Sequence, residues 1–249
     1  MTPASRSEGL GHSGSAQPSI GDRVDSVRAR LAVAARRAGR DPSQVTLVAA
    51  TKTVSAARVA EAVAAGVSDL GENRAQELLA KAPLVAEVMG AHLADSAWIS
   101  APTDLRAPHW HFLGTLQRNK VKRLAPWIAC WESVDRLALG EVIARHAPGA
   151  RVLVEVNISQ EAQKSGCAPS DTGVLVDGLR GLGLAVLGLM AVPRHDDDPR
   201  RAFAAMRTMA EALDLADLSI GMSDDFEIAV EEGATIVRVG RAIFGDRIE

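Results

Sequence analysis

The sequence predicts an α/β fold, a single (β/α)₈ barrel. Short apolar, strand-like segments alternate with helix-like segments about eight times along the chain, as expected of parallel βαβ units. A length of 249 residues suits a barrel of eight such units in one domain. No G-x-G-x-x-G motif follows a predicted strand, which argues against an open, doubly wound dinucleotide-binding sheet. We expect residues 20–249 to form the barrel.

Composition and charge narrow the class of protein. Apolar residues make up 47% and charged residues 24%, as in soluble globular proteins, and the net charge is −3. No positive field therefore recruits nucleic acid or an anionic membrane. No apolar stretch reaches the roughly 18 residues of a membrane span, and the N-terminus lacks the apolar core of a signal peptide. We expect a cytoplasmic protein in which Cys130 and Cys167 are free thiols.

The elements follow one another in a regular order. Residues 1–19 are rich in Gly, Ser, Pro and Ala, which predicts a flexible tail. An additional helix starts at Ile20, because Val24, Val27 and Leu31 recur at three- and four-residue steps. Strands are predicted at 45–52, 68–71, 110–114, 127–131, 151–158, 184–192, 218–222 and 236–239. Helices are predicted at 55–65, from 74 onward, and at 116–124, 135–146, 174–182, 199–213 and 224–232.

The first predicted strand ends at Lys52. The run VTLVAATK is almost continuously apolar, as in a strand buried on both faces of a parallel sheet. Its lysine falls at the carboxyl edge, where α/β proteins bind ligands. A lysine amine in apolar surroundings is more often the neutral base that attacks carbonyls, so Lys52 is a Schiff-base candidate. A lysine that snorkels from the strand end to solvent explains the same residue.

Other polar residues and glycines also follow the predicted strands. A barrel enzyme or binding protein should gather its functional residues at this edge. They are Asn73 after the second strand, Gly114 and Gln117 after the third, Asn157 and Lys164 after the fifth, Ser223 after the seventh, and Gly240 with Arg241 after the last.

Two of these loops have the character of a phosphate site. Residues 221–225 offer the Ser223 hydroxyl and backbone N–H groups, and residues 240–245 offer a second glycine-bounded turn. Barrels commonly bind phosphate with the loops after strands 7 and 8. Together with a lysine on the first strand, they suggest pyridoxal 5′-phosphate (PLP) or a sugar-phosphate aldehyde. The alternative is that Ser223 only caps a helix and the glycines only form turns.

Six sequence blocks resemble one known family. They are ATKT, DLGENRAQE, WHFLGTLQRNK, VLVEVNISQEAQKSG, GLMAV and LSIGMSDDFEIAVEEGATIVRVGRAIFG, in this order between residue 50 and residue 245. They resemble the PLP homeostasis proteins, whose barrel is that of the N-terminal domain of alanine racemase. The departures, at Thr115, Arg118 and Pro193-Arg194, concern loop details.

The resemblance implies roles for individual residues. Lys52 would carry PLP as a Schiff base, and Asn73 would belong to the cofactor site. Ser223 and the backbone of Gly240 and Arg241 would hold the phosphate. Arg238 would face the pyridine nitrogen. Because an arginine cannot give up its proton, the ring nitrogen would stay unprotonated and the ring would be a poor electron sink.

The resemblance also implies a function. The protein would take part in intracellular PLP homeostasis as a monomeric carrier without significant turnover, with PLP-dependent apo-enzymes as candidate partners. One alternative is a PLP-dependent amino-acid racemase of the same fold, and another is a Schiff-base aldolase. Alanine racemase takes its second base, a tyrosine, from a partner subunit and has a C-terminal β domain. This sequence contains no tyrosine and ends with the last barrel strand and its loop.

Some residues could suggest a metal site or a second reactive amine, but a structural role explains most of them. His109 and His111 would share a strand face, and packing explains them better than a metal site, since a third ligand is not evident. The aspartates at 196–198 precede Pro199 and fit a solvated helix start. Lys164 is either a surface lysine or a second amine near the barrel mouth.

Overall fold

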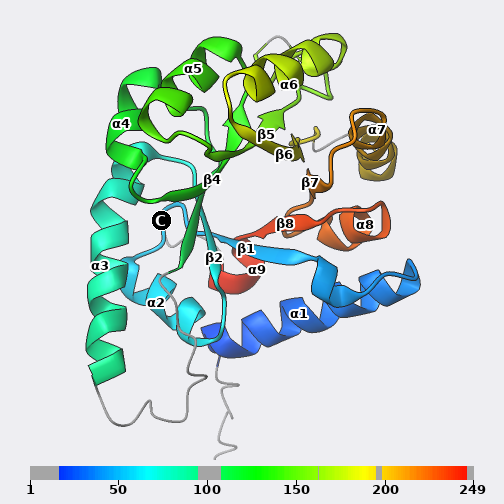
Figure 1. Cartoon of the computed structure of the whole chain (residues 1–249). Helices are drawn as coiled ribbons and strands as arrows, with labels where there is room; N and C mark the ends of the chain where they lie inside the picture. Colours follow the sequence, from blue (N-terminus) through cyan, green and yellow to red (C-terminus); the bar gives the residue numbers. More distant parts are fainter. Residues whose placement is uncertain (1–16, 95–107, 162, 195–197, 246–249) are drawn as a thin grey trace, which may run out of the picture.

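A computed structural model describes residues 17–94, 108–161, 163–194 and 198–245. Its strands form a closed, parallel barrel in chain order, β1 to β8, and β1 pairs with both β2 and β8 (Figure 1). The predicted (β/α)₈ barrel is therefore confirmed. The predicted tail, residues 1–19, falls almost wholly outside the described residues.

The strands are close to their predicted positions. They are β1 (Thr46–Ala50), β2 (Asp69–Glu72), β3 (His109–Phe112), β4 (Ile128–Val134), β5 (Arg151–Glu155), β6 (Ala185–Met190), β7 (Asp217–Ser219) and β8 (Ile236–Val239). Two strands end earlier than the apolar runs suggested. The backbone at Thr53, with φ 64°, turns away after β1, and after β5 only Val156 makes an isolated bridge, with Cys167.

Helices cover the outside of the barrel. They are α1 (Ile20–Arg37), α2 (Ala56–Ala64), α3 (Ala75–Ala94), α4 (Val121–Leu124), α5 (Leu137–His146), α6 (Thr172–Gly181), α7 (Pro199–Ala212), α8 (Phe226–Glu231) and α9 (Arg241–Phe244). The predicted helix at 116–124 is instead a 3₁₀ turn, Arg118–Lys120, followed by α4. Helix α3 continues through Pro83, and α9 forms where only a loop was expected.

Side-chain caps fix where several helices begin. Ser19 and Asp22 form a reciprocal capping box at α1, and the Ser55 side chain accepts from Arg58 N at α2. Asp198 caps α7 by accepting from Arg200 N, as expected of the aspartates before Pro199. Residues 195–197 lie outside the described residues.

Alternation along the strands divides the core into two parts. A small cluster fills the inside of the barrel: Val48, Cys130, Leu153, Met190 and Ile236. A larger cluster lies between the strands and the helices. Side chains two residues from a member of the inner cluster also face inward, and several of these are charged.

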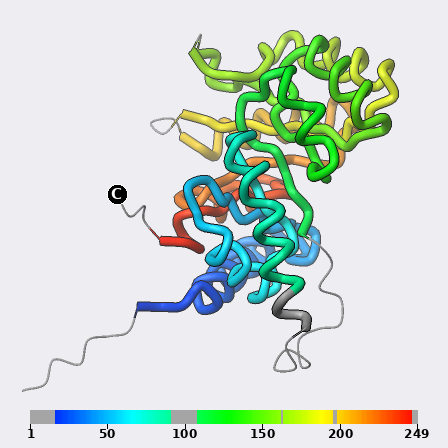
Figure 2. Tube along the Cα trace, turned by 90° about the vertical axis from the view of Figure 1, so that its left-hand side faces the viewer, coloured from blue at the N-terminus to red at the C-terminus, as the bar shows by residue number. Residues whose placement is uncertain are grey.

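Helix α1 packs against α2, α8 and α9 (Figure 1). Figure 2 shows its first turns on the same side of the barrel as α9, the last described helix. There Arg23 lies close to Gly245, within 3.2 Å of the position a β-carbon would take. No helix of the described residues is both long enough and apolar enough to span a membrane.

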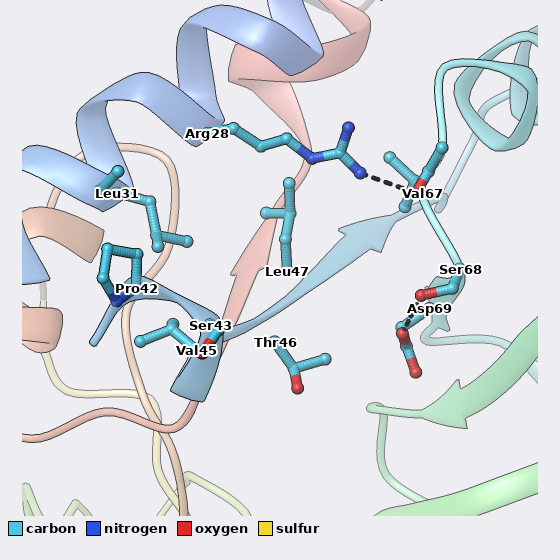
Figure 3. A pocket seen from close by; sticks show the side chains of 12 residues that line it. Arg28, Leu31, Pro42, Ser43, Val45, Thr46, Leu47, Val67, Ser68 and Asp69 are labelled. Carbon is cyan, nitrogen blue, oxygen red and sulfur yellow. Dashed lines mark hydrogen bonds between the residues drawn. The ribbon is translucent and has the colours of Figure 1, made fainter.

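A cavity of about 430 Å³ lies at the amino-terminal end of the barrel (Figure 3). Arg28 of α1 borders it and donates to the carbonyls of Ala65 and Gly66, at the end of α2. The first residues of β1, Thr46 and Leu47, form another wall. This cavity is at the opposite end of the strands from the residues that the sequence singled out.

Candidate functional site

The carboxyl edge brings three of the predicted segments together. Gly240 lies against the end of β1, where an added β-carbon would be 3.1 Å from the carbonyl oxygen of Ala50. The Ser223 hydroxyl accepts from the backbone N–H of Ala242 at 3.3 Å. The loops after β7 and β8 therefore contact each other, beside the strand that precedes Lys52.

Lys52 itself is exposed, as in the second of the two interpretations that the sequence left open. Strand β1 ends at Ala50, and the turn at residues 52–53 lifts the Lys52 side chain into an exposed position. The argument from an apolar environment is therefore wrong for this structure, because the apolar run reaches the strand end but not the lysine. The position of Lys52 at the mouth of the barrel, after the first strand, is as predicted.

A buried ion pair holds the turn that carries Lys52. Lys81, on α3, donates from Nζ to Glu72 Oε2 at 2.6 Å and to the carbonyl of Thr51 at 2.7 Å. The Thr51 hydroxyl donates to the same carboxylate at 3.0 Å, and Glu72 Oε1 accepts from the backbone N–H of Asn73 at 2.8 Å. One Lys–Glu pair thus fixes the backbone beside both Lys52 and Asn73.

The Ser223 loop is built differently from a simple helix cap. Asp225, not Ser223, occupies the N-cap position of α8, and its carboxylate accepts from the backbone N–H of Met222 at 2.6 Å. Ser223 is half-buried and connects this loop to the one after β8. Arg241 pairs with Asp224 across the same junction. The cap interpretation of Ser223 is therefore wrong.

Arg238 points into the barrel, where it is 5% exposed. Its Nη1 donates to the carbonyl and the hydroxyl of Ser219, at 2.7 and 2.5 Å, and its Nη2 donates to the carbonyl of Ala191 at 3.0 Å. Glu132 Oε2 lies 4.0 Å from Nη1. Burial lowers the pKa of the guanidinium from its ordinary value, although nearby carboxylates oppose the shift, and an arginine remains cationic.

A chain of polar groups continues from Arg238 through the barrel. The Ser219 hydroxyl donates to Glu132 Oε2 at 2.6 Å, and Glu132 Oε1 is 2.5 Å from Nδ1 of His111. His111 Nε2 lies 3.1 Å from Oδ1 of Asp69, which borders the amino-terminal cavity. Buried charges of alternating sign therefore link the two ends of the barrel.

His111 is the cation in the middle of this chain. Burial opposes its protonation, but the hydrogen bonds with Asp69, Cys130 and Glu132 outweigh burial and raise the pKa of His111 to about 11. His109 Nδ1 lies 3.4 Å from the same Asp69 carboxylate. Among the described residues no group of His, Cys, Asp and Glu side chains is suited to a metal ion.

The lysine of the loop after β5 is paired within its own loop. Asn157 donates from Nδ2 to the carbonyl of Glu161 at 2.7 Å, and Lys164 Nζ lies 2.7 Å from Glu161 Oε1. The hydroxyls of Thr115 and Ser165, 2.6 Å apart, join this loop to the loop after β3. Gly114 and Gln117 lie in that second loop, and a β-carbon at Gly114 would be only 2.0 Å from the carbonyl oxygen of Asn73.

Several buried polar residues were not singled out from the sequence. They are Glu72, Lys81, Glu132 and Ser219, together with the half-buried Glu155, whose Oε2 is buried. Glu132 and Glu155 each interrupt an apolar strand run, in ACWES and VLVEV. A carboxylate in such a run is a usable signal, because acidic side chains are almost never buried without a partner.

Comparison with known proteins places this geometry in a family. The chain matches the family "Alanine racemase, N-terminal domain" over residues 23–248. It is 41% identical to the pyridoxal phosphate homeostasis protein of Pseudomonas aeruginosa, over 92% of this chain and 96% of that protein. The chain belongs to the pyridoxal phosphate homeostasis protein family. The family member of Escherichia coli K12 is 35% identical over 92% of this chain and 97% of its own length.

Solved structures agree with membership in the PLP homeostasis family. The crystal structure of an unknown protein from Bifidobacterium adolescentis superposes with a TM-score of 0.80 at 38% identity, covering 90% of this chain and 94% of its own. PipY of Synechococcus elongatus, with PLP bound, gives 0.71 at 32% identity, covering 91% and 100%. The lysine/ornithine decarboxylase of Vibrio vulnificus gives 0.62 at 16% identity, covering 90% of this chain and 62% of its own, which reflects the fold alone.

Proposed function

We propose that this chain is a PLP-binding protein of intracellular PLP homeostasis, and that it carries PLP as a Schiff base on Lys52. The observation that carries the proposal is the convergence, at one edge, of the Lys52 turn with the Ser223 and Gly240 loops. An amine beside a phosphate-binding pair of loops is what an aldehyde phosphate requires. A relative at 32% identity, PipY, has been solved with PLP bound.

The residues at this edge fit such a cofactor. Ser223 offers a hydroxyl to the phosphate. Gly240 lies close to the end of β1 and has no side chain, so a phosphate can approach the backbone N–H groups of its loop. We assign the phosphate to Ser223 and to the backbone of Gly240 and Arg241. Asn73 contributes from the next strand end, where its backbone is held by Glu72.

Arg238 is the proposed partner of the pyridine nitrogen. Its guanidinium is anchored by Ser219 and Ala191, so its remaining N–H groups are held in a fixed orientation. Bound PLP can in general supply an electron sink for amino-acid chemistry. A permanently protonated guanidinium keeps its own proton and so weakens that sink.

A carrier role follows from what this chain lacks for racemisation. The sequence contains no tyrosine to act as a second base. His111, the histidine that could replace it, is buried between Glu132 and Asp69 inside the barrel. We therefore favour storage and transfer of PLP to PLP-dependent apo-enzymes over turnover, in a monomeric, cytoplasmic protein.

The test is an absorption titration of the purified protein with PLP, followed by borohydride reduction and peptide mapping. We expect a protein-bound PLP band that borohydride removes, with one pyridoxyl group on the peptide containing Lys52. The Lys52→Met variant should lose the reducible band, and Lys122→Met, on an exposed face, should keep it. A label chiefly on Lys164 or Lys120 would contradict the assignment.

A further inference from the structure

Glu155 is a carboxyl group at the mouth of the barrel, and one of its two oxygens finds no hydrogen-bond partner in the described part of the chain. It is the last residue of β5, and Leu153, two residues earlier, belongs to the inner cluster. Alternation therefore turns the Glu155 side chain inward at the carboxyl end of the strand. Its Oε2 is buried and has no hydrogen-bond partner among the described residues. A buried, unpaired carboxylate oxygen is costly, so this atom requires an explanation.

The groups around Glu155 do not satisfy it. Asp135, in the loop after β4, repels its negative charge, and Arg238, on β8, attracts it. Glu132 of β4 is already engaged by His111 and Ser219. Strand β6, the other neighbour, contributes no titratable side chain within Ala185–Met190.

The balance of these effects favours the protonated acid. Burial is the largest cause, Asp135 adds to it and Arg238 opposes it, and together they raise the pKa of Glu155 to about 7. A protonated carboxyl has an O–H to donate, which a carboxylate lacks. The group is thus a hydrogen-bond donor near neutral pH that points into the proposed cofactor site.

We propose that Glu155 is a ligand-binding residue of this site: its protonated carboxyl donates a hydrogen bond to an acceptor atom of bound PLP, and above neutral pH binding takes up one proton from solvent onto Glu155. The inference rests on the proposed function, because it requires the anionic cofactor to occupy the mouth. The step is a proton transfer: an O–H bond of water breaks, an O–H bond forms on Oε2, and the hydroxide left behind is neutralised by the buffer. The ligand supplies the acceptor that Oε2 lacks in the free protein.

The negative charge of the ligand favours protonation of Glu155 when it binds. A phosphorylated ligand brings negative charge toward Glu155 and stabilises the acid further. At a pH above 7 the free protein has lost this proton and must regain it to bind. Each pH unit above 7 then weakens binding up to tenfold, as long as the complex stays protonated. Below pH 7 the group is already protonated and the dependence disappears.

The experiment is a set of PLP titrations from pH 6 to 9 at fixed salt, on the full chain and on Glu155→Gln, with the ratio of the two affinities taken at each pH. The ratio removes every pH dependence that the two proteins share, including the titration of PLP itself. Because glutamine keeps an N–H donor but cannot ionise, we expect the two proteins to bind alike at pH 6. At pH 8.5 the variant should bind at least about tenfold more tightly. Calorimetry at pH 8.5, in two buffers of different ionisation enthalpy, counts the protons taken up when PLP binds. The native chain should take up as much as one proton more than Glu155→Gln.

Two further variants separate the possible outcomes. Glu155→Leu, which has no donor, should bind PLP about tenfold more weakly than Glu155→Gln at pH 6, and Glu211→Gln on the exposed face of α7 should match the native chain at every pH. Equal affinities of the native chain and Glu155→Gln from pH 6 to 9 would overturn the inference, leaving Oε2 as a group satisfied by water. A failure of the native chain to bind PLP at any pH would instead overturn the proposed function.

Discussion

The ammonium group of Lys81 donates to the carbonyl oxygen of Thr51 at 2.7 Å, at the residue immediately before Lys52. Lys81 is buried on α3, and the same Nζ is 2.6 Å from Glu72 Oε2. The exposed lysine proposed to react with PLP is thus held in place by a second, buried lysine that the sequence did not indicate. The two have different tasks, because Lys81 is already engaged in an ion pair.

Replacing Lys81 should therefore damage the fold and the site together. Lys81→Met leaves the Glu72 carboxylate buried without its cation, which typically costs about 3–5 kcal/mol of stability. We expect a lower unfolding midpoint in urea and at least about tenfold weaker PLP binding, because the Thr51 carbonyl loses its anchor. The double variant Glu72→Gln/Lys81→Met should recover part of the stability, while Lys122→Met, on an exposed helix face, should change neither property.

Ser223→Ala tests the phosphate loop. A hydrogen bond to a charged group contributes roughly 1.5–3 kcal/mol, so PLP affinity should fall about ten- to a hundred-fold while the fold persists. Titration at fixed salt measures this, with Ser43→Ala at an exposed turn as the control. If Ser223→Ala bound PLP as tightly as the native chain, the hydroxyl would serve only to hold Ala242.

The sequence was sufficient to predict the barrel, because regular alternation of strand and helix patterns reflects burial, a local property of each segment. It also predicted the edge at which Lys52, Asn73, Ser223 and Gly240 gather, because parallel strands end together. It could not predict which interior groups meet. Glu132 touches His111 from an adjacent strand but Ser219 from three strands away, and such contacts depend on barrel closure.

The sequence left open whether the Lys52 side chain is buried or reaches solvent, for a related reason. A strand pattern shows where the apolar residues end, here at Ala50, but not how the chain turns beyond them. The left-handed conformation of Thr53, whose N–H donates to Glu77 Oε2 at 2.9 Å, sets this turn. That contact joins residues 24 positions apart and leaves no periodic signal in the sequence.

Glu155 should make stability depend on pH in the cofactor-free protein. Its pKa is raised from 4.5 to about 7, so the native state binds this proton more tightly than the unfolded state. The free energy of unfolding therefore falls as pH rises from 4.5 through 7. Glu155→Gln should stabilise the protein by up to about 3 kcal/mol at pH 8 and should have no charge-related effect at pH 4. Urea unfolding at both pH values measures the difference, and a stabilisation that is equal at pH 4 and pH 8 would contradict the assignment.

His111 should make stability fall with rising pH in the same direction as Glu155, but over a higher range of pH. Its pKa is raised from 6.5 to about 11, so its charged form stabilises the native state fully below pH 6.5. This stabilisation declines as pH rises above 6.5 and is lost as pH passes through 11. His111→Asn should therefore destabilise the protein more at pH 6 than at pH 9, by about 1–3 kcal/mol. His146→Asn, at the end of α5, serves as a control, and a cost for His111→Asn that did not change with pH would mean that His111 is neutral.

The last prediction is that the protein loaded with PLP does not racemise amino acids at a useful rate. Racemisation needs proton transfer on both faces of the substrate carbon, and each positioned acid or base contributes about 10²–10⁴ in rate. Lys52 offers one base, but the chain has no tyrosine for the other face, and His111 is held inside the barrel by Glu132 at 2.5 Å. Arg238, anchored at Ser219, would also keep the ring nitrogen unprotonated and the electron sink weak. We expect α-proton exchange of L- and D-alanine in deuterated water, with saturating PLP, to remain far below about 1 s⁻¹, the low end of ordinary enzyme turnover. Exchange of both enantiomers at or above that rate would mean that water or another group supplies the missing acid, and would restore the racemase in place of the carrier.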